Sequence, residues 1–272
     1  METTVKKANA LLKLDRQIVG VKLVNTKEEF EKYQAITAVA PISYCVAVKS
    51  ATLGHSLKFT VENSGCGGST RALGLQAPTE NFYNGKDGCR LGLYCDEELS
   101  ANVASKMKIC EPGTYGVIVK PLEKFEGEGR PDVVLIVAEP RNIMRIIQGY
   151  TYFYGMQESF CMSGNQAVCV EATALPMITQ EINVSMFCSG TRFLAGWNDS
   201  EMVVGIPYEQ FGTTVEGLRM TVNAVEMDDR KLEIKDALEP LGYSKDEITM
   251  GDAYYIRLEE EKRRKRKEKK SE

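Results

Sequence analysis

Histidine is nearly absent from this 272-residue chain, and long apolar runs are missing from it. The single histidine, His55, gives no basis for a His-rich zinc or copper site, and any Ser–His or Cys–His catalytic pair would have to use it. The longest unbroken apolar run, Val133 to Ala138, falls far short of the roughly 20 residues that a membrane-spanning helix needs. These absences exclude a transmembrane helix and a histidine-based metal centre.

The N-terminus also lacks an apolar segment. It carries the charged residues Lys6, Lys7, Lys13, Asp15 and Arg16 where a signal peptide would have its apolar region. With no export signal evident, and with 43% apolar and 26% charged residues, we expect a cytoplasmic globular protein. Structural disulfides are rare in that compartment, so the eight cysteines are candidates for metal binding, for redox chemistry or for no special role.

Charge is distributed unevenly along the chain. Residues 259–272 hold eight basic and five acidic residues, although the net charge of the whole chain is −4. The body that precedes this basic tail is therefore more acidic than the net charge suggests. An acidic body argues against nucleic acid as the main partner, and the composition gives no reason to expect a membrane partner.

A short pattern occurs twice. From Cys66 the chain reads C-G-G-S-T-R-A-L-G, and from Cys188 it reads C-S-G-T-R-F-L-A. Upstream, Cys45-Val46 has a counterpart in Cys169-Val170. Each copy follows the order strand, helix, cysteine, strand and cysteine–glycine turn, which suggests an internal duplication. Deleting one residue pairs Cys66 with Cys188, Gly68 with Gly190, Thr70 with Thr191 and Arg71 with Arg192.

The same order leads to a prediction of the fold. We expect an α/β or α+β protein in which two similar, pseudo-symmetric halves pack as one body. The first half is residues 1–122, the second is residues 131–225, and residues 226–272 form a charged C-terminal appendage with the basic tail. Expected strands are 19–24, 57–62, 115–119 and 133–137; expected helices are 26–34, 44–53, one capped by Asp96, and others beginning near Pro140 and Pro207; expected turns are 63–69 and 188–190.

A pseudo-twofold arrangement would bring four cysteines towards one point: Cys45, Cys66, Cys169 and Cys188. Four thiolates in one place repel each other, and a metal ion or cluster removes that conflict by binding them. Four cysteine ligands suit zinc or an iron–sulfur cluster such as [4Fe–4S]. Because none of the four has a close C-x-x-C partner, the spacing favours the cluster over zinc. Free cysteines that pack as small apolar residues are the other interpretation.

The glycine-rich turns allow an additional function. Backbone N–H groups at Gly67, Gly68 and Gly190 could surround an anion or cluster sulfides, and Arg71 and Arg192 could hold an anionic substrate or offset cluster charge. The turn after Cys66 matches neither a P-loop nor a dinucleotide fingerprint. A structural turn without a ligand is the alternative. We expect no special role for the remaining cysteines, which are Cys89, Cys95, Cys110 and Cys161.

Several segments together resemble one known family. The segments are LDRQIVGVK (14–22), YCVAVK (44–49), TVENSGCGG (60–68), PDVVLIV (131–137), MRIIQGYTYFY (144–154) and SMFCSGTR (185–192). The resemblance runs in order from about residue 10 to about residue 222, and it is to domain of unknown function 169, the ArCR-like family. It implies no settled activity, but such proteins are typical of archaea and anaerobic bacteria, which suits an oxygen-sensitive site. It also implies that Cys45, Cys66, Cys169 and Cys188 are the cysteines of the family motifs.

These observations lead to one main functional hypothesis. We expect a cytoplasmic protein that binds an iron–sulfur cluster through the four cysteines and carries out redox or sulfur chemistry on a small anionic substrate. The alternatives are a metal-free module that binds a small anion or has a regulatory role, and a structural zinc protein. No residue pattern identifies a catalytic group.

Overall fold

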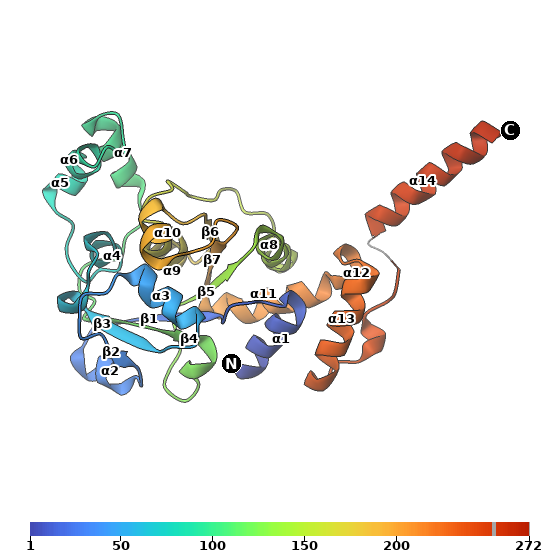
Figure 1. The fold of residues 1–272 in the computed structure, drawn as a ribbon, viewed down its shortest axis with the longest axis horizontal. Helices are drawn as coiled ribbons and strands as arrows, with labels where there is room; N and C mark the ends of the chain where they lie inside the picture. Colours follow the sequence, from blue (N-terminus) through green and yellow to red (C-terminus); the bar gives the residue numbers. More distant parts are fainter. Residues whose placement is uncertain (252–253, 272) are drawn as a thin grey trace. The chain divides into compact units, whose positions relative to one another are not determined.

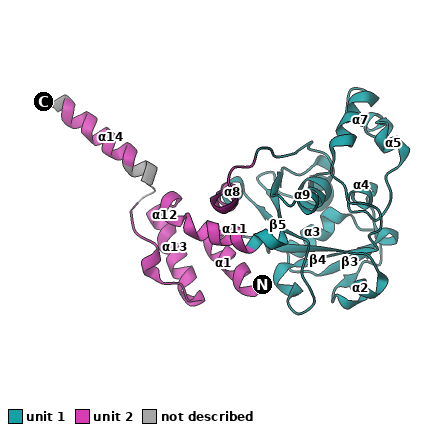
Figure 2. Cartoon of the chain, turned by 180° about the vertical axis from the view of Figure 1, so that it is seen from behind, with its two compact units in different colours: residues 1, 15–143, 158–211 teal, residues 2–14, 144–157, 212–272 magenta. Residues whose placement is uncertain are grey.

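The structure is a computed structural model that describes residues 1–251 and 254–271, and its chain forms two compact units (Figures 1 and 2). Unit 1 consists of residues 1, 15–143 and 158–211. Unit 2 consists of residues 2–14, 144–157 and 212–272. All strands and all the cysteines fall within unit 1.

Unit 1 is built on a seven-stranded mixed sheet with the order β2-β3-β4-β1-β5-β7-β6. Neighbouring strands are antiparallel except β2 and β3, which are parallel. The mixed α/β class is therefore confirmed, as are the predicted strands at 19–24 and 133–137, although β7 was not predicted. The strands are β1 (Val19–Val24), β2 (Ile36–Thr37), β3 (Leu57–Thr60), β4 (Gly116–Pro121), β5 (Val133–Ala138), β6 (Asn183–Ser185) and β7 (Met202–Pro207).

Strands β1 and β5 pair at the centre of the sheet, where Gly20 lies opposite Val134. On one side of this pair, Val19 of β1 lies opposite Pro121, the last residue of β4. On the other side, Val133 of β5 lies opposite Pro207, the last residue of β7. Proline ends both neighbouring strands because it has no N–H group with which to continue a ladder.

One face of the sheet carries the main hydrophobic core of unit 1 (Figure 1). Alternate strand residues, among them Val21, Val119 and Leu135, point to this face because successive side chains of a strand point to opposite sides. They pack against α3 (Tyr44–Thr52), α4 (Gly67–Ala72) and the π-helix η3 (Ala167–Ala174), and α10 (Ser189–Ala195) contacts α3. On the other face, Phe30 of α2 (Lys27–Lys32) packs with Ile118 and Phe125.

Helix caps explain where two of these helices begin. The hydroxyl of Thr26 accepts a hydrogen bond from the N–H of Glu29, 3.1 Å away, at the start of α2. The carboxylate of Asp96 accepts one from the N–H of Leu99, 2.7 Å away, at the start of α7 (Glu97–Lys106). The cap at Asp96 was predicted and is confirmed. In α7 the buried residues are Ser100 and Ala104, and Leu99 is exposed.

The two predicted turns are also partly wrong. Helix α4 begins at Gly67 and α10 begins at Ser189, so Cys66 and Cys188 are N-cap residues with extended backbones. Gly67, Gly68 and Gly190 therefore lie in first helical turns, and none of them has a positive φ. Small residues after a cap can continue as helix here because neighbouring hydroxyls bond back to the first carbonyls.

Further short elements connect these parts of unit 1. A small helical lobe, residues 80–106, lies in sequence between α4 and β4 and carries Cys89 and Cys95. The other described helices of unit 1 are η1 (Val61–Asn63), α5 (Glu80–Tyr83), α6 (Lys86–Arg90), η2 (Leu122–Phe125) and α9 (Leu175–Thr179).

Unit 2 is helical. A β-carbon on Gly217 of α11 (Tyr208–Met220) would lie 1.9 Å from the carbonyl oxygen of Gly149 in α8 (Pro140–Tyr154), so glycine lets these two helices touch. The buried Arg145 donates to Glu226 at 2.7 Å, and α1 (Glu2–Leu12) packs on α13 (Asp228–Leu238), which buries Ile234 and Leu238. The other described helices of unit 2 are α12 (Val222–Val225), η4 (Glu239–Leu241), η5 (Lys245–Glu247) and α14 (Tyr254–Ser271).

The helices predicted to begin near Pro140 and Pro207 are confirmed as α8 and α11, and α11 buries Phe211, Val215 and Leu218. Within the described ranges, no helix is both long enough and apolar enough to cross a membrane.

Gly205 of β7 is the point where the backbone of η3 rests on the sheet. A β-carbon there would lie 1.8 Å from the carbonyl oxygen of Ala172. We therefore expect Gly205→Ala to lower the free energy of unfolding by about 1–3 kcal/mol through overpacking. Gly212→Ala in α11, where a β-carbon meets nothing within 4 Å, is the matched control and should raise it by about 0.5–1 kcal/mol. Urea unfolding followed by circular dichroism measures both, and equal effects would contradict this account of the packing.

Candidate functional site

Four cysteines that are far apart in the sequence belong to the layer that covers one face of the sheet. Cys45 lies in the first turn of α3, and Cys169 lies in η3. Cys66 and Cys188 are the N-cap residues of α4 and α10. Cys169 is buried, and the other three are partly buried.

Cys45 and Cys188 are connected through Thr191. The hydroxyl of Thr191 lies 2.9 Å from the sulfur of Cys188, and the N–H of Thr191 donates to the same sulfur at 3.3 Å. The side chains of Cys45 and Thr191 also interact by a hydrogen bond. The sulfur of Cys45 donates to Ser43, 3.5 Å away, which is the N-cap of α3. Helices α3 and α10 thus meet at this pair of cysteines.

Cys66 lies beside the beginning of η3. A β-carbon on Gly68 would have the Cys66 sulfur at 3.7 Å and the side chain of Gln166 at 3.6 Å. Gln166 immediately precedes η3 and has a left-handed backbone, with φ of 53°. Such a conformation is strained for a residue with a side chain, and tertiary contacts must hold it.

The π-helix that carries Cys169 is fixed at several points. Its residue Glu171 is buried and accepts hydrogen bonds from the N–H of Ser163 at 2.6 Å and the hydroxyl of Ser185 at 2.5 Å. Its residue Thr173 lies 2.7 Å from the hydroxyl of Tyr44 in α3. Windings of this kind are rare and are often found at functional sites.

The electrostatic environment shows that the four thiols are near one another. Burial raises the pKa of the Cys169 thiol well above its usual value, and Cys66, Cys45 and Cys188 raise it further. Burial also raises the pKa of Cys45; Ser43 and Thr191 lower it through hydrogen bonds, and Cys66 and Cys188 raise it. Each additional thiolate therefore makes the next ionisation less favourable.

The four thiols are nevertheless not gathered tightly. Among the residues that the structure describes, no three His, Cys, Asp or Glu side chains lie in an arrangement that would hold one metal ion. A single zinc ion with Zn–S bonds of about 2.3 Å would need its sulfur ligands within roughly 4 Å of each other.

The remaining cysteines lie apart from this set. Burial is the main cause that raises the pKa of Cys110 to about 11, and the charge that acts on it is Asp132 rather than another cysteine. Cys95 and Cys161 are exposed, and the Cys95 thiol donates to Asp96 at 3.2 Å.

The two arginines of the repeated pattern have different surroundings. Arg192 donates to three backbone carbonyls, those of Asn198 at 2.6 Å, Met186 at 2.8 Å and Glu201 at 3.0 Å. Arg71 lies over the ring of Phe82, 4.1 Å from its centre. Burial lowers the pKa of its guanidinium, and the nearby Asp87, Cys169 and Cys66 oppose this shift.

Open space is found beside two of the three glycines. A β-carbon on Gly67 or on Gly190 would meet nothing within 4 Å, whereas one on Gly68 would touch Cys66 and Gln166. Sequence reasoning did not identify Thr191 or Gln166 as part of this region. The recurring Thr-Arg pair after Cys66 and Cys188 was a usable signal for Thr191, but no signal pointed to Gln166.

Comparison with known proteins shows the family. The sequence matches the family described as uncharacterised ArCR, domain of unknown function 169, over residues 8–217. The chain belongs to the ArCR family. The uncharacterized protein MJ0308 of Methanocaldococcus jannaschii is 30% identical over 216 residues, which cover 78% of this chain and 91% of that protein. No solved structure matches the chain. The resemblance expected from the motifs is confirmed, and the ArCR match includes all four cysteines but not α13 or α14.

The pKa directions predict an order of reaction for the metal-free protein. Alkylating reagents attack the thiolate, so a raised pKa and burial both slow the reaction near pH 8. We expect iodoacetamide to label the exposed Cys161 first and Cys169 last, and we expect labelling of Cys169 to accelerate as the pH rises above 9. Peptide mass spectrometry at timed intervals measures this order. Equal rates at Cys161 and Cys169 would contradict the buried position of Cys169.

Proposed function

We propose that this ArCR protein binds an iron–sulfur cluster through Cys45, Cys66, Cys169 and Cys188. The observation that carries the proposal is that burial raises the pKa of the Cys169 thiol and that Cys66, Cys45 and Cys188, from three other elements, raise it further. By contrast, the charged group that raises the pKa of Cys95 is Asp96 and the one that raises the pKa of Cys110 is Asp132. The proposal concerns cluster binding first; redox or sulfur chemistry on a small anionic substrate is the activity that would follow.

The chemistry of the donor set fits the group. Four thiols with no carboxylate or imidazole among them are soft ligands, which select Fe–S clusters or zinc over hard cations. Burial raises the pKa of Cys45 and of Cys169, which favours the protonated thiol at both positions, and a bound cationic centre would stabilise the thiolates. When bound, a cluster supplies one-electron transfer at a potential set by its surroundings.

The sequence spacing of the thiols favours a cluster over a single zinc ion, because none of the four cysteines has a close C-x-x-C partner. A cluster places several irons between its ligands, so its cysteine sulfurs lie farther apart than those of a mononuclear site. Open space beside Gly67 and Gly190, next to two of the cysteines, suits a group larger than one ion.

We also propose that the two halves arose by duplication and are related by a pseudo-twofold axis at the β1–β5 pair. The strand order supports this, because β4 and β3 lie outward from β1 as β7 and β6 lie outward from β5. The register supports it too, since Val19 lies opposite Pro121 and Val133 lies opposite Pro207. The next strand outward continues the correspondence. Leu57, the first residue of β3, lies opposite Val119, two residues before Pro121. Asn183, the first residue of β6, lies opposite Gly205, two residues before Pro207.

On this proposal each half contributes one cysteine from a helix and one from an N-cap. Arg71 would offset cluster charge, since it is near Cys66 and Cys169. Arg192 would have a positioning role, because its guanidinium holds the carbonyls on both sides of α10. Gly67, Gly68 and Gly190 would leave room beside the thiols.

Anaerobic purification tests the ligand set. We expect a brown protein with iron and acid-labile sulfide in equal amounts, and we expect each of C45S, C66S, C169S and C188S to lose most of both, because each removes one covalent ligand. Cys110→Ser is the matched control, since Cys110 is partly buried but lies outside the set. Iron, sulfide and zinc assays with visible absorption spectra measure the result.

The outcomes separate the proposed function from its alternatives. Stoichiometric zinc without iron would assign a structural zinc site, and a colourless protein that takes up neither metal on anaerobic reconstitution would overturn the proposal. Retention of iron in any two of the four variants, with circular dichroism unchanged, would show that the ligand set is wrong.

The basic tail is expected to have no part in this site. Residues 259–272 lie outside the matched region of the family and outside unit 1. A chain truncated after Leu258 should therefore keep its full content of iron and sulfide. A loss of more than half of the iron, with unit 1 still folded, would contradict this.

A further inference from the structure

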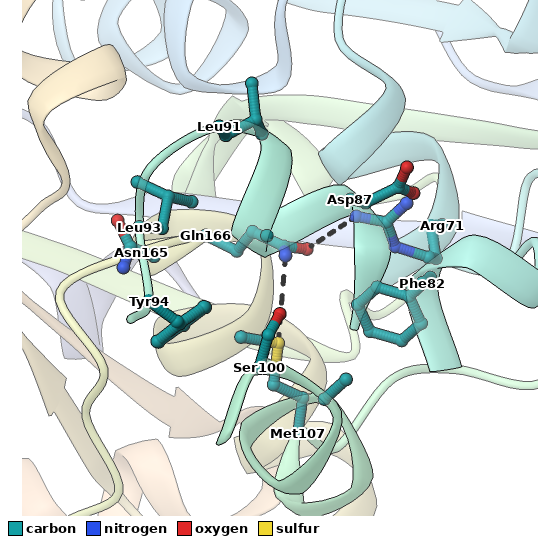
Figure 3. A pocket seen from close by; sticks show the side chains of 12 residues that line it. Arg71, Phe82, Asp87, Leu91, Leu93, Tyr94, Ser100, Met107, Asn165 and Gln166 are labelled. Carbon is teal, nitrogen blue, oxygen red and sulfur yellow. Dashed lines mark hydrogen bonds between the residues drawn. The ribbon is translucent and has the colours of Figure 1, made fainter. Parts of the chain in front are cut away.

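A small cavity lies beside Arg71 in unit 1 (Figure 3). Its volume is about 50 Å³, and its lining includes Arg71 of α4, Phe82 of α5, Tyr94, Ser100 of α7 and Gln166. The helical lobe of residues 80–106 provides one wall, and α4 with the residues before η3 provides another. Cavities of this size hold a few water molecules or one very small ligand.

Several hydrogen-bond donors that line the cavity have no acceptor or only a distant one. The Nε of Arg71 and the hydroxyl of Tyr94 are buried, and neither has a hydrogen-bond partner among the described residues. The Nη2 of Arg71 makes a long bond, 3.5 Å, to the Oε1 of Gln166. The Nε2 of Gln166 has only the sulfur of Met107, 3.7 Å away. A buried donor without a partner costs about 1–3 kcal/mol, so this arrangement favours an acceptor in the cavity.

The shape and charge of the cavity limit what that acceptor can be. The guanidinium of Arg71 lies over the ring of Phe82, 4.1 Å from its centre, and its unpartnered Nε with Nη2 could bind a planar group with two oxygens. Asp87 also lines the cavity, and its carboxylate reduces the positive charge that Arg71 brings (Figure 3). Asp87 is itself near Arg90 at 3.8 Å and Thr79 at 3.4 Å. These features favour a single negative charge over two.

We infer that this cavity binds a small planar monoanion, such as formate, acetate, bicarbonate or nitrite, through Arg71, Tyr94 and Gln166. Two of the four cysteines are near residues that line the cavity: Gln166 and the Cys66 sulfur lie on either side of the same β-carbon position at Gly68, and Arg71 is close to Cys66 and Cys169. The inference deepens the proposed function by giving the class of the anionic substrate, and only the role of the anion as substrate rests on that function. Binding itself stands on the cavity and its donors.

Titration of the anaerobically purified protein with sodium formate and with sodium nitrite tests the inference. We expect saturable binding of both by isothermal titration calorimetry, and no binding of sulfate or phosphate at equal ionic strength. Arg71→Gln should weaken formate binding at least about tenfold, because it removes a charged donor pair. Tyr94→Phe removes only the hydroxyl and should weaken it about three- to tenfold.

Arg90→Gln is the control variant, since Arg90 belongs to the same lobe but does not line the cavity. Its affinity for formate should stay within about twofold of that of the parent chain. Absence of formate and nitrite binding would overturn the inference, and so would unchanged affinity in both Arg71→Gln and Tyr94→Phe. Tighter binding of sulfate than of formate would also overturn it.

The same titration on metal-free Cys188→Ser separates the two proposals. If formate binds to metal-free Cys188→Ser, and if adding Arg71→Gln to this variant weakens formate binding, the anion site is supported even if no cluster forms. If a cluster is present in the parent protein but no anion binds in either form, the cluster stands and this inference fails.

Discussion

The burial of Cys169 close to three partly buried thiols is the constraint on which the candidate site depends. Cys169 is packed among apolar side chains, and three other thiols raise its pKa beyond the effect of burial. Such a group cannot ionise as a set in the absence of a cation. The elements that hold the thiols are nevertheless well fixed, by Thr191 between α3 and α10 and by Tyr44 with Thr173 between α3 and η3. The fold thus holds the four thiols on separate elements that are anchored to one another.

The sequence predicted the parts of the fold that depend on local signals. Strong apolar runs gave β1 and β5, and the caps at Thr26 and Asp96 gave the starts of two helices. β7 was not predicted. Turns were predicted at 63–69 and 188–190 because they contain glycine, which often adopts a positive φ. The glycines after Cys66 and Cys188 have helical backbones without a positive φ, so helices begin there.

The sequence predicted only part of the candidate site. Repetition of the Cys-x-Gly-Thr-Arg pattern pointed to the cysteine set, but it treated Arg71 and Arg192 as equivalent. Three backbone carbonyls engage Arg192, whereas Arg71 lies over Phe82 from an inserted lobe that has no counterpart in the second copy of the pattern. Long-range contacts of this kind, and the left-handed Gln166, arise from tertiary packing and leave no local pattern.

The winding of η3 has a consequence for the spacing of residues around Cys169. In a π-helix each turn takes up more residues than in an α-helix, and the bond from the Thr173 hydroxyl to the Val168 carbonyl spans five positions. Removing one residue between 167 and 174 would let the segment relax into an α-helix, and every later side chain would rotate by roughly 100°. Glu171 and Thr173 would then leave Ser185 and Tyr44, and the sulfur would change its direction relative to the sheet. The length of this segment is thus as strict a requirement as its amino-acid types, so insertions and deletions should be tolerated in the loops of unit 1 far better than here.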